Sequence, residues 1–175
     1  MRALDLLFAL AMSVLLASCS ASTSSSLAES KPSVRPGSPA SLLQQVRSAG
    51  QIGDELDVQP LRDPRVEDLR SQASAAEVRG DYVMATSLLA QASRYTPEDP
   101  DLLQWQAEMA LVGKDWSRAG QLANQSWEQG PKLGGLCRRN WTTLQLVAES
   151  RGDAAAAAQA QQRVAACTVP PPNRY

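Results

Sequence analysis

Three cysteines are the residues of this 175-residue chain most suited to chemistry, because the sequence contains no histidine. Cys19 follows an apolar run, whereas Cys137 and Cys167 lie near the C-terminus. Without histidine, a Ser-His-Asp or Cys-His mechanism is impossible within this chain, and the commonest metal ligand is missing. Two thiols make a poor metal site, and the sequence has no C-x-x-C spacing for a catalytic dithiol. We therefore expect these cysteines to have structural or anchoring roles.

The acidic residues give little support for an enzyme. Pairs such as Glu67 and Asp68, or Glu98 and Asp99, lie near expected helix starts, where capping and the helix dipole explain them. The sequence contains no phosphate loop, nucleotide fingerprint or metal motif. The net charge of −1 provides no basic field for nucleic acid. We expect a non-enzymatic protein without cofactor, metal, nucleic-acid partner or small-molecule substrate; an Asp/Glu-based cell-wall enzyme is a remote alternative.

Residues 1–18 are typical of an export signal, with Arg2 before a mostly apolar run from Leu6 to Ala17. This run is too short to span a bilayer, which needs about 20 apolar residues. The segment Leu16-Ala17-Ser18-Cys19 resembles the lipobox of bacterial lipoproteins. The resemblance implies cleavage before Cys19 and acylation of that residue, with palmitate among the chains. The alternatives are an ordinary secretory signal and a buried N-terminal helix.

Ser20, which follows the expected lipidated cysteine, points by the same resemblance to the outer membrane. The chain would then be lipid-anchored and face the periplasm. Residues 19–40, rich in Ser and Pro, offer almost nothing to bury and are expected to form a disordered tether. Residues 41–63 predict a short helix, opened by a capping box at Ser41 and running to about residue 48, and a linker that lie on the first repeat. Within this linker, residues 54–61 could form a short extended stretch.

A constant offset of 34 residues relates two stretches in the middle of the chain. It separates Tyr82 from Trp116, Ala85 from Ala119, and Pro97 from Pro131, as read from the sequence. A fixed period of this size is the signature of a repeat array. Asp-Pro pairs and Pro or Gly breaks predict helices at about 65–79, 82–95, 101–112 and 115–129.

This pattern resembles the tetratricopeptide repeat (TPR), through its Gly80-Asp81-Tyr82 turn, Ala85, Ala92 and Pro97. The second copy departs from the pattern with Ser126 where Ala is usual. A third, divergent copy would place helices at about 136–150 and 153–167, with extra residues near Gly134 and Gly135; a low-complexity tail is the alternative for the last segment. The resemblance implies an all-α fold, an α-solenoid of about three helical hairpins. The domain would span 64–168, with repeats at about 64–97, 98–131 and 134–168, and a disordered tail at 169–175.

The third hairpin brings Cys137 and Cys167 into register. Gly152 lies midway between them in the sequence, and residues equidistant from the turn of an antiparallel hairpin lie side by side. An exported protein reaches an oxidising compartment. We therefore predict a Cys137–Cys167 disulfide that clamps the open end of this hairpin.

In TPR proteins the first helices of the repeats line a concave groove that binds peptides or protein segments. The resemblance carries this role onto eight positions, and Arg138, Arg139 and Thr142 would extend the groove in the third repeat. A plain solvated face is the alternative interpretation. The eight positions are Glu67, Arg70, Ser74, Glu77, Asp101, Gln104, Glu108 and Leu111.

The sequence as a whole predicts a TPR lipoprotein that acts as a protein–protein interaction adaptor. It would support the assembly of a cell-envelope machine, such as a pilus, secretion or cell-wall apparatus. Its partners would be proteins of the envelope and, through the anchor, the membrane itself. The alternative is a structural subunit that is permanently packed in an envelope complex.

Overall fold

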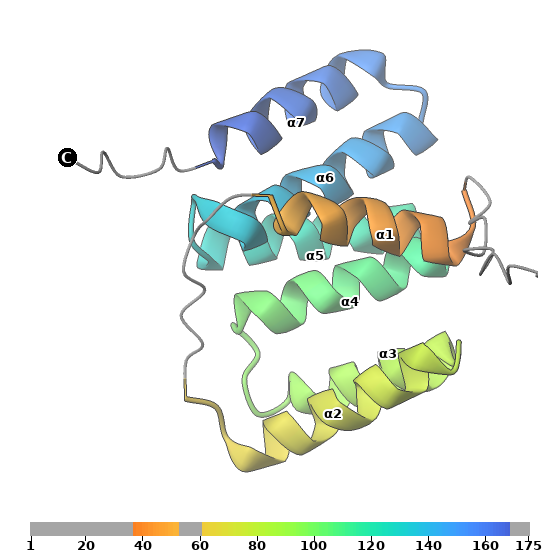
Figure 1. Cartoon of the computed structure of the whole chain (residues 1–175), viewed down its shortest axis with the longest axis vertical. Coiled ribbons are helices and arrows are strands. Elements are labelled where there is room, and N and C mark those ends of the chain that lie inside the picture. The colour runs from red at the N-terminus through yellow and green to blue at the C-terminus, as the bar shows by residue number, and fades with distance from the viewer. Residues whose placement is uncertain (1–36, 53–60, 169–175) are drawn as a thin grey trace, which may run out of the picture. The chain divides into compact units, whose positions relative to one another are not determined.

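The computed structural model describes residues 37–52 and 61–168, which belong to one compact unit. These residues form helices and no strands, so the predicted all-α class is confirmed (Figure 1). The predicted signal peptide, Cys19, most of the tether, the stretch at 54–60 and the C-terminal tail lie outside the described residues. No helix among those described is long and apolar enough to cross a membrane. The helices are α1 (Pro39–Gly50), α2 (Pro64–Val78), α3 (Tyr82–Ala92), α4 (Pro100–Val112), α5 (Trp116–Gln129), α6 (Gly134–Ser150) and α7 (Ala154–Ala166).

Three helical hairpins follow α1 along the chain. Helix α2 packs against α3, α4 against α5, and α6 against α7, while α5 also packs on α6 and α3 on α4. Figure 1 shows these pairs as successive layers of the same unit. The six helices agree with the predicted ranges to within a few residues. Asp caps fix the starts of five of them, whereas α6 follows Leu133, which makes no side-chain cap hydrogen bond.

The three hairpin turns share one backbone design. In each, a residue with positive φ precedes an Asp that caps the second helix: Gly80 (76°), Lys114 (59°) and Gly152 (71°). The N–H of the following Asp donates to a carbonyl five residues back, at 2.9 to 3.0 Å, which closes the first helix. The Asp carboxylate then accepts a hydrogen bond from the third N–H of the next helix. The second copy therefore places the left-handed residue at Lys114 and not at Gly113.

We expect Lys114→Gly to stabilise the protein by about 0.5–1 kcal/mol, because a side chain in the left-handed region is strained and glycine removes that strain. Urea denaturation measures the change. The matched control is Gly80→Ala, which should destabilise by a similar amount for conformational reasons alone, since no atom lies within 4 Å of an added Cβ at Gly80. A destabilised Lys114→Gly variant would contradict this account of the turn.

Helix α4 forms the centre of the unit and is the most buried of the described helices. Its apolar residues contribute to all three hydrophobic clusters, together with residues of the helices on either side. Ala85 and Ala119, the small repeat residues, are both fully buried, which allows close approach of neighbouring helices. Three polar side chains of α4, those of Gln104, Gln106 and Glu108, are also buried and need hydrogen-bond partners within the protein.

Helix α1 differs in two ways from its prediction. It begins at Pro39, capped by Ser38, whose hydroxyl accepts a hydrogen bond from the Ser41 N–H at 3.2 Å, so Ser41 is an interior residue and not the cap. Proline at the first helical position favours this earlier start. The helix packs mainly against α6 and α4 (Figure 1), and it contacts the first repeat, on which it was expected to lie, through fewer residues, such as Leu43 and Arg47. Its apolar face of Leu42, Leu43 and Val46 is buried there.

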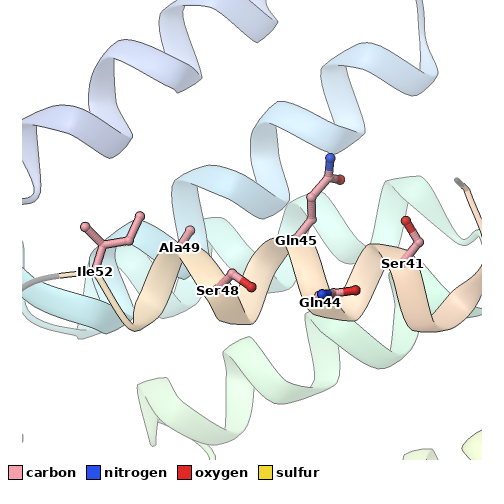
Figure 2. Close-up of a pocket in the computed structure, with 6 residues that line it drawn as sticks. All are labelled: Ser41, Gln44, Gln45, Ser48, Ala49 and Ile52. Atoms are coloured by element: carbon pink, nitrogen blue, oxygen red, sulfur yellow. The ribbon is translucent and has the colours of Figure 1, made fainter. Parts of the chain in front are cut away.

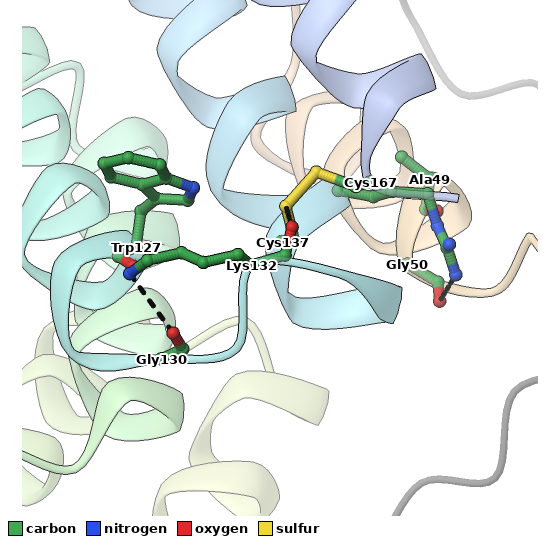
Figure 3. The surroundings of a disulfide bond; sticks show 8 residues. Ala49, Gly50, Trp127, Gly130, Lys132, Cys137 and Cys167 are labelled. Carbon is green, nitrogen blue, oxygen red and sulfur yellow. Dashed lines mark hydrogen bonds between the residues drawn. A yellow bond between two sulfur atoms is a disulfide. The ribbon is translucent and has the colours of Figure 1, made fainter. Parts of the chain in front are cut away.

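The third hairpin is joined at its open end. Cys137 near the start of α6 and Cys167 at the end of α7 form a disulfide, with their Cα atoms 5.7 Å apart (Figure 3). Beside it, the Gly134 N–H donates a hydrogen bond to the Cys167 carbonyl at 2.7 Å. Both cysteines are buried, so the bond belongs to the packed interior of this hairpin.

Candidate protein-binding face

The structure divides the eight predicted groove residues into three groups. Glu67 and Ser74 are exposed on α2. Glu77, Arg70 and Asp101 are partly buried and form ion pairs between helices. The other three have no exposed surface, because α1 and α6 cover them; they are Gln104, Glu108 and Leu111 of α4. Of the three residues predicted to extend the groove, Arg138 and Thr142 are buried and Arg139 is partly buried.

Glu108 is the centre of the polar contacts on this face. Its Oε2 accepts a hydrogen bond from Arg47 Nε of α1 at 2.9 Å. Its Oε1 accepts two from Arg139 of α6, at 2.9 Å from Nε and 2.6 Å from Nη2. Gln104 donates a longer bond to the same oxygen at 3.3 Å and a second one to Thr143 at 2.9 Å. A fully buried carboxylate is tolerated here because two guanidinium groups satisfy it.

Arg47 links this centre to the first hairpin. Both of its terminal nitrogens bond to the Glu77 carboxylate, at 3.0 Å for the Nη2–Oε2 pair. Glu77 also accepts a hydrogen bond from the Trp105 indole at 2.8 Å. Burial alone would lower the pKa of Arg47, but the hydrogen bonds and charges of Glu77 and Glu108 outweigh it and raise that pKa. Arg47 therefore stays charged and holds α1 to both α2 and α4.

A second group of charges lies around Asp101 at the start of α4. Its Oδ2 accepts hydrogen bonds from Arg62 at 2.8 Å and from Arg70 at 3.2 Å. The Arg139 guanidinium lies 3.6 Å from its other oxygen. The Arg70 guanidinium also lies over the Trp105 ring, 5.2 Å from its centre. These contacts connect the linker before α2 with α2, α4 and α6.

The apolar contacts of α1 lie beside these charges. Leu42 and Val46 pack in one cluster with Leu111 of α4 and Leu146 of α6. At the far end of α1, the buried Arg138 donates a hydrogen bond from Nε to the Ala49 carbonyl at 2.9 Å. It thereby satisfies one of the free carbonyls at the helix C-terminus.

Close backbone packing also occurs at the C-terminal end of α1. A Cβ added at Gly135 would lie 2.6 Å from the Gly50 carbonyl oxygen, and one added at Gly50 would lie 2.8 Å from the Arg139 side chain. Figure 3 shows Gly50 in the region of the disulfide. The inserted Gly134-Gly135 pair therefore makes room for the end of α1.

We call the surface of Glu77, Glu108, Leu111, Arg138 and Leu146 the α1-covered face.

The outward side of α1 is polar, in contrast to its buried side. Figure 2 shows residues of this side, which all come from α1 and the residue pair after it. They are Ser41, Gln44, Gln45, Ser48, Ala49 and Ile52. Helix α1 is therefore amphipathic, with one side fitted to the hairpins and the other facing outward.

Sequence reasoning missed the role of α1 at this face. It identified Glu77 and Glu108 but gave no role to Arg47, which pairs with both. The available signal was local: Leu42, Leu43 and Val46 have the spacing of one helical face, and Arg47 follows directly. Such a face must be buried against something, but its spacing does not say which helices receive it.

Comparisons with known proteins give a similarity among solved structures. No protein-family model matches the chain, and no curated protein sequence matches it. Among solved structures, the globular C-terminal domain of P. aeruginosa LpoP is similar, with a TM-score of 0.56 and 27% sequence identity. The match covers 60% of this chain and 99% of that domain. The chain thus shares a helical fold with nearly the whole of the LpoP domain.

Proposed function

We propose that this chain is a non-enzymatic adaptor lipoprotein of the outer membrane, whose helical unit faces the periplasm and binds a protein of the cell-wall machinery. The similarity to nearly all of the LpoP C-terminal domain carries this proposal. It favours cell-wall machinery over the pilus and secretion alternatives that the sequence left open. The lipobox-like segment ending at Cys19 supports the anchor, and its acyl chains would supply stable membrane attachment.

The proposed binding surface is the side of the unit formed by the first helices of the hairpins. It contains the charged contacts around Glu77, Asp101 and Glu108, and its exposed edge on α2 carries Glu67 and Ser74. The TPR-like repeat, with its three hairpins of matching turns, supports this assignment. Surfaces of this kind bind helices or extended segments through a mixture of apolar and polar contacts.

Site-specific photo-crosslinking in intact cells tests the proposal. A photoreactive amino acid replaces Ser74, which is exposed on α2, or Ser87, which is exposed on α3 of the same hairpin and serves as the matched control. We expect the Ser74 probe to capture a periplasmic protein that builds or remodels the cell wall, at least tenfold more efficiently than the Ser87 probe. Capture from Ser87 alone would contradict the assigned surface, and capture from neither position would contradict the adaptor function.

A further inference from the structure

Helix α1 is placed like a bound ligand. Among the described helices it is the one outside the three hairpins, and its covalent connection to them runs through residues 51–63. It nevertheless covers much of the side to which the TPR resemblance assigns partner binding. Its buried residues enter clusters formed by other helices: Leu43 joins residues of α2, α3 and α4, while Val46 joins residues of α4 and α6.

The α1-covered face retains most of its own contacts without α1. Glu108 would keep its two hydrogen bonds from Arg139 and the one from Gln104. Glu77 would keep the Trp105 indole. The hairpins are joined to one another by α3 on α4 and α5 on α6, and the third is closed by the disulfide. Removal of α1 therefore exposes an organised surface with two carboxylates beside the apolar Leu111 and Leu146.

The chemistry of this surface specifies its occupant. Leu111 and Leu146 pack against apolar side chains of α1. The carboxylates of Glu77 and Glu108 both form ion pairs with the same guanidinium group, that of Arg47. Arg138 receives the last carbonyls of a helix, which fixes the direction in which the helix lies. A Cβ added at Gly50 would lie 2.8 Å from the Arg139 side chain, which favours a residue without a side chain at the end of that helix.

From these contacts we propose that the α1-covered face is a receptor for one amphipathic helix, and that α1 is its intramolecular occupant. A partner protein would displace α1 by presenting a helix of the same pattern: two adjacent apolar residues, an apolar residue one turn later, an arginine beside it and a small C-terminal residue. This inference rests on the proposed adaptor function and names the kind of segment that the partner contributes. Because α1 is covalently attached to the hairpins, its effective concentration at this face is high. A weak ligand in solution therefore does not displace it.

A peptide-binding experiment on the full chain tests the proposal without any partner. The probe is a fluorescein-labelled peptide of residues 38–52, measured by fluorescence anisotropy. The chain carries Val46→Asp, which places a charge at a fully buried position and so weakens docking of its own α1. We expect the released chain to bind the peptide at least tenfold more tightly than the unmodified chain does. A peptide carrying Arg47→Glu is the matched control and should lose this binding.

Two results would overturn the proposal. One is a released chain that keeps its helical circular dichroism and thermal transition but binds the peptide no better than the control peptide. The other is loss of the folded hairpins in Val46→Asp and also in the milder Arg47→Ala chain, in which Glu108 keeps Arg139; this would show that α1 is an inseparable part of the core. Neither result depends on photo-crosslinking from Ser74, so failure here and failure of the adaptor function are distinguishable.

Discussion

Replacing Glu108 by alanine is expected to lower the free energy of unfolding by about 3–5 kcal/mol, the range for breaking a buried ion pair by removing one partner. The carboxylate has no exposed surface and accepts hydrogen bonds from Arg47, Arg139 and Gln104. Its removal leaves two guanidinium groups without their buried acceptor, although Arg47 keeps Glu77 and Arg139 keeps Asp101. These remaining contacts place the expected loss at the lower end of the range.

Thermal denaturation followed by circular dichroism measures this effect, as a fall in the melting temperature of about 10 °C. Glu67→Ala is the matched control, because Glu67 lies on the exposed side of α2 and its ion pair with Arg70 is 4.0 Å long. Its effect should stay within about 0.5 kcal/mol. Glu108→Gln keeps the shape of the side chain and should fall between the two. Equal stability of Glu108→Ala and Glu67→Ala would show that the buried carboxylate does not hold α1, α4 and α6 together.

The second large effect is expected from removing the disulfide. The variant Cys137→Ala/Cys167→Ala opens a loop of 30 residues, and the chain-entropy model gives a loss of about 3–4 kcal/mol for a loop of this length. Urea denaturation with and without reductant measures it. Reduced wild-type protein should match the double variant, and reductant should not change the double variant.

The loss should also be local in the fold. Because Cys137 and Cys167 join α6 to α7, amide hydrogen exchange should accelerate first in the third hairpin, while α2 and α3 at the other end change least. Two free thiols in protein isolated from the periplasm, detected by mass spectrometry, would contradict the premise of this prediction. Uniform acceleration of exchange in all helices would instead show that the disulfide supports the whole unit.

The hairpins could be predicted from the sequence because their signals are local. Asp63 and Asp99 before proline start two of the helices, and Gly80 and Gly152 mark two of the turns. The left-handed residue of the second turn is harder to place from sequence, because the glycine of that turn, Gly113, lies one position before it. Lys114 takes that conformation because the capping Asp115 must follow directly, as Asp81 follows Gly80.

The placement of α1 could not be predicted because it depends on contacts between distant residues. Arg47 meets Glu77 and Glu108, and Arg138 meets Ala49, across 30 to 89 positions of sequence. Local patterns show that α1 has an apolar side but contain no information about which helices receive it. For the same reason Gln104 and Leu111, which lie on the first-helix side of their repeat, were expected in an open groove and are buried.

The order of contacts along α1 has a mechanical consequence. A pull on the N-terminal segment reaches α1 at Pro39, and the first contacts under load are those of Leu42 and Leu43. The guanidinium of Arg47 and the carbonyls of Ala49 and Gly50, held by Arg138, lie at the opposite end and are loaded last. Tension therefore peels the helix from its start, one turn at a time, and does not shear all contacts at once. If Cys19 carries the proposed lipid anchor, this geometry makes α1 the first of the described helices to yield when the N-terminal segment is stretched.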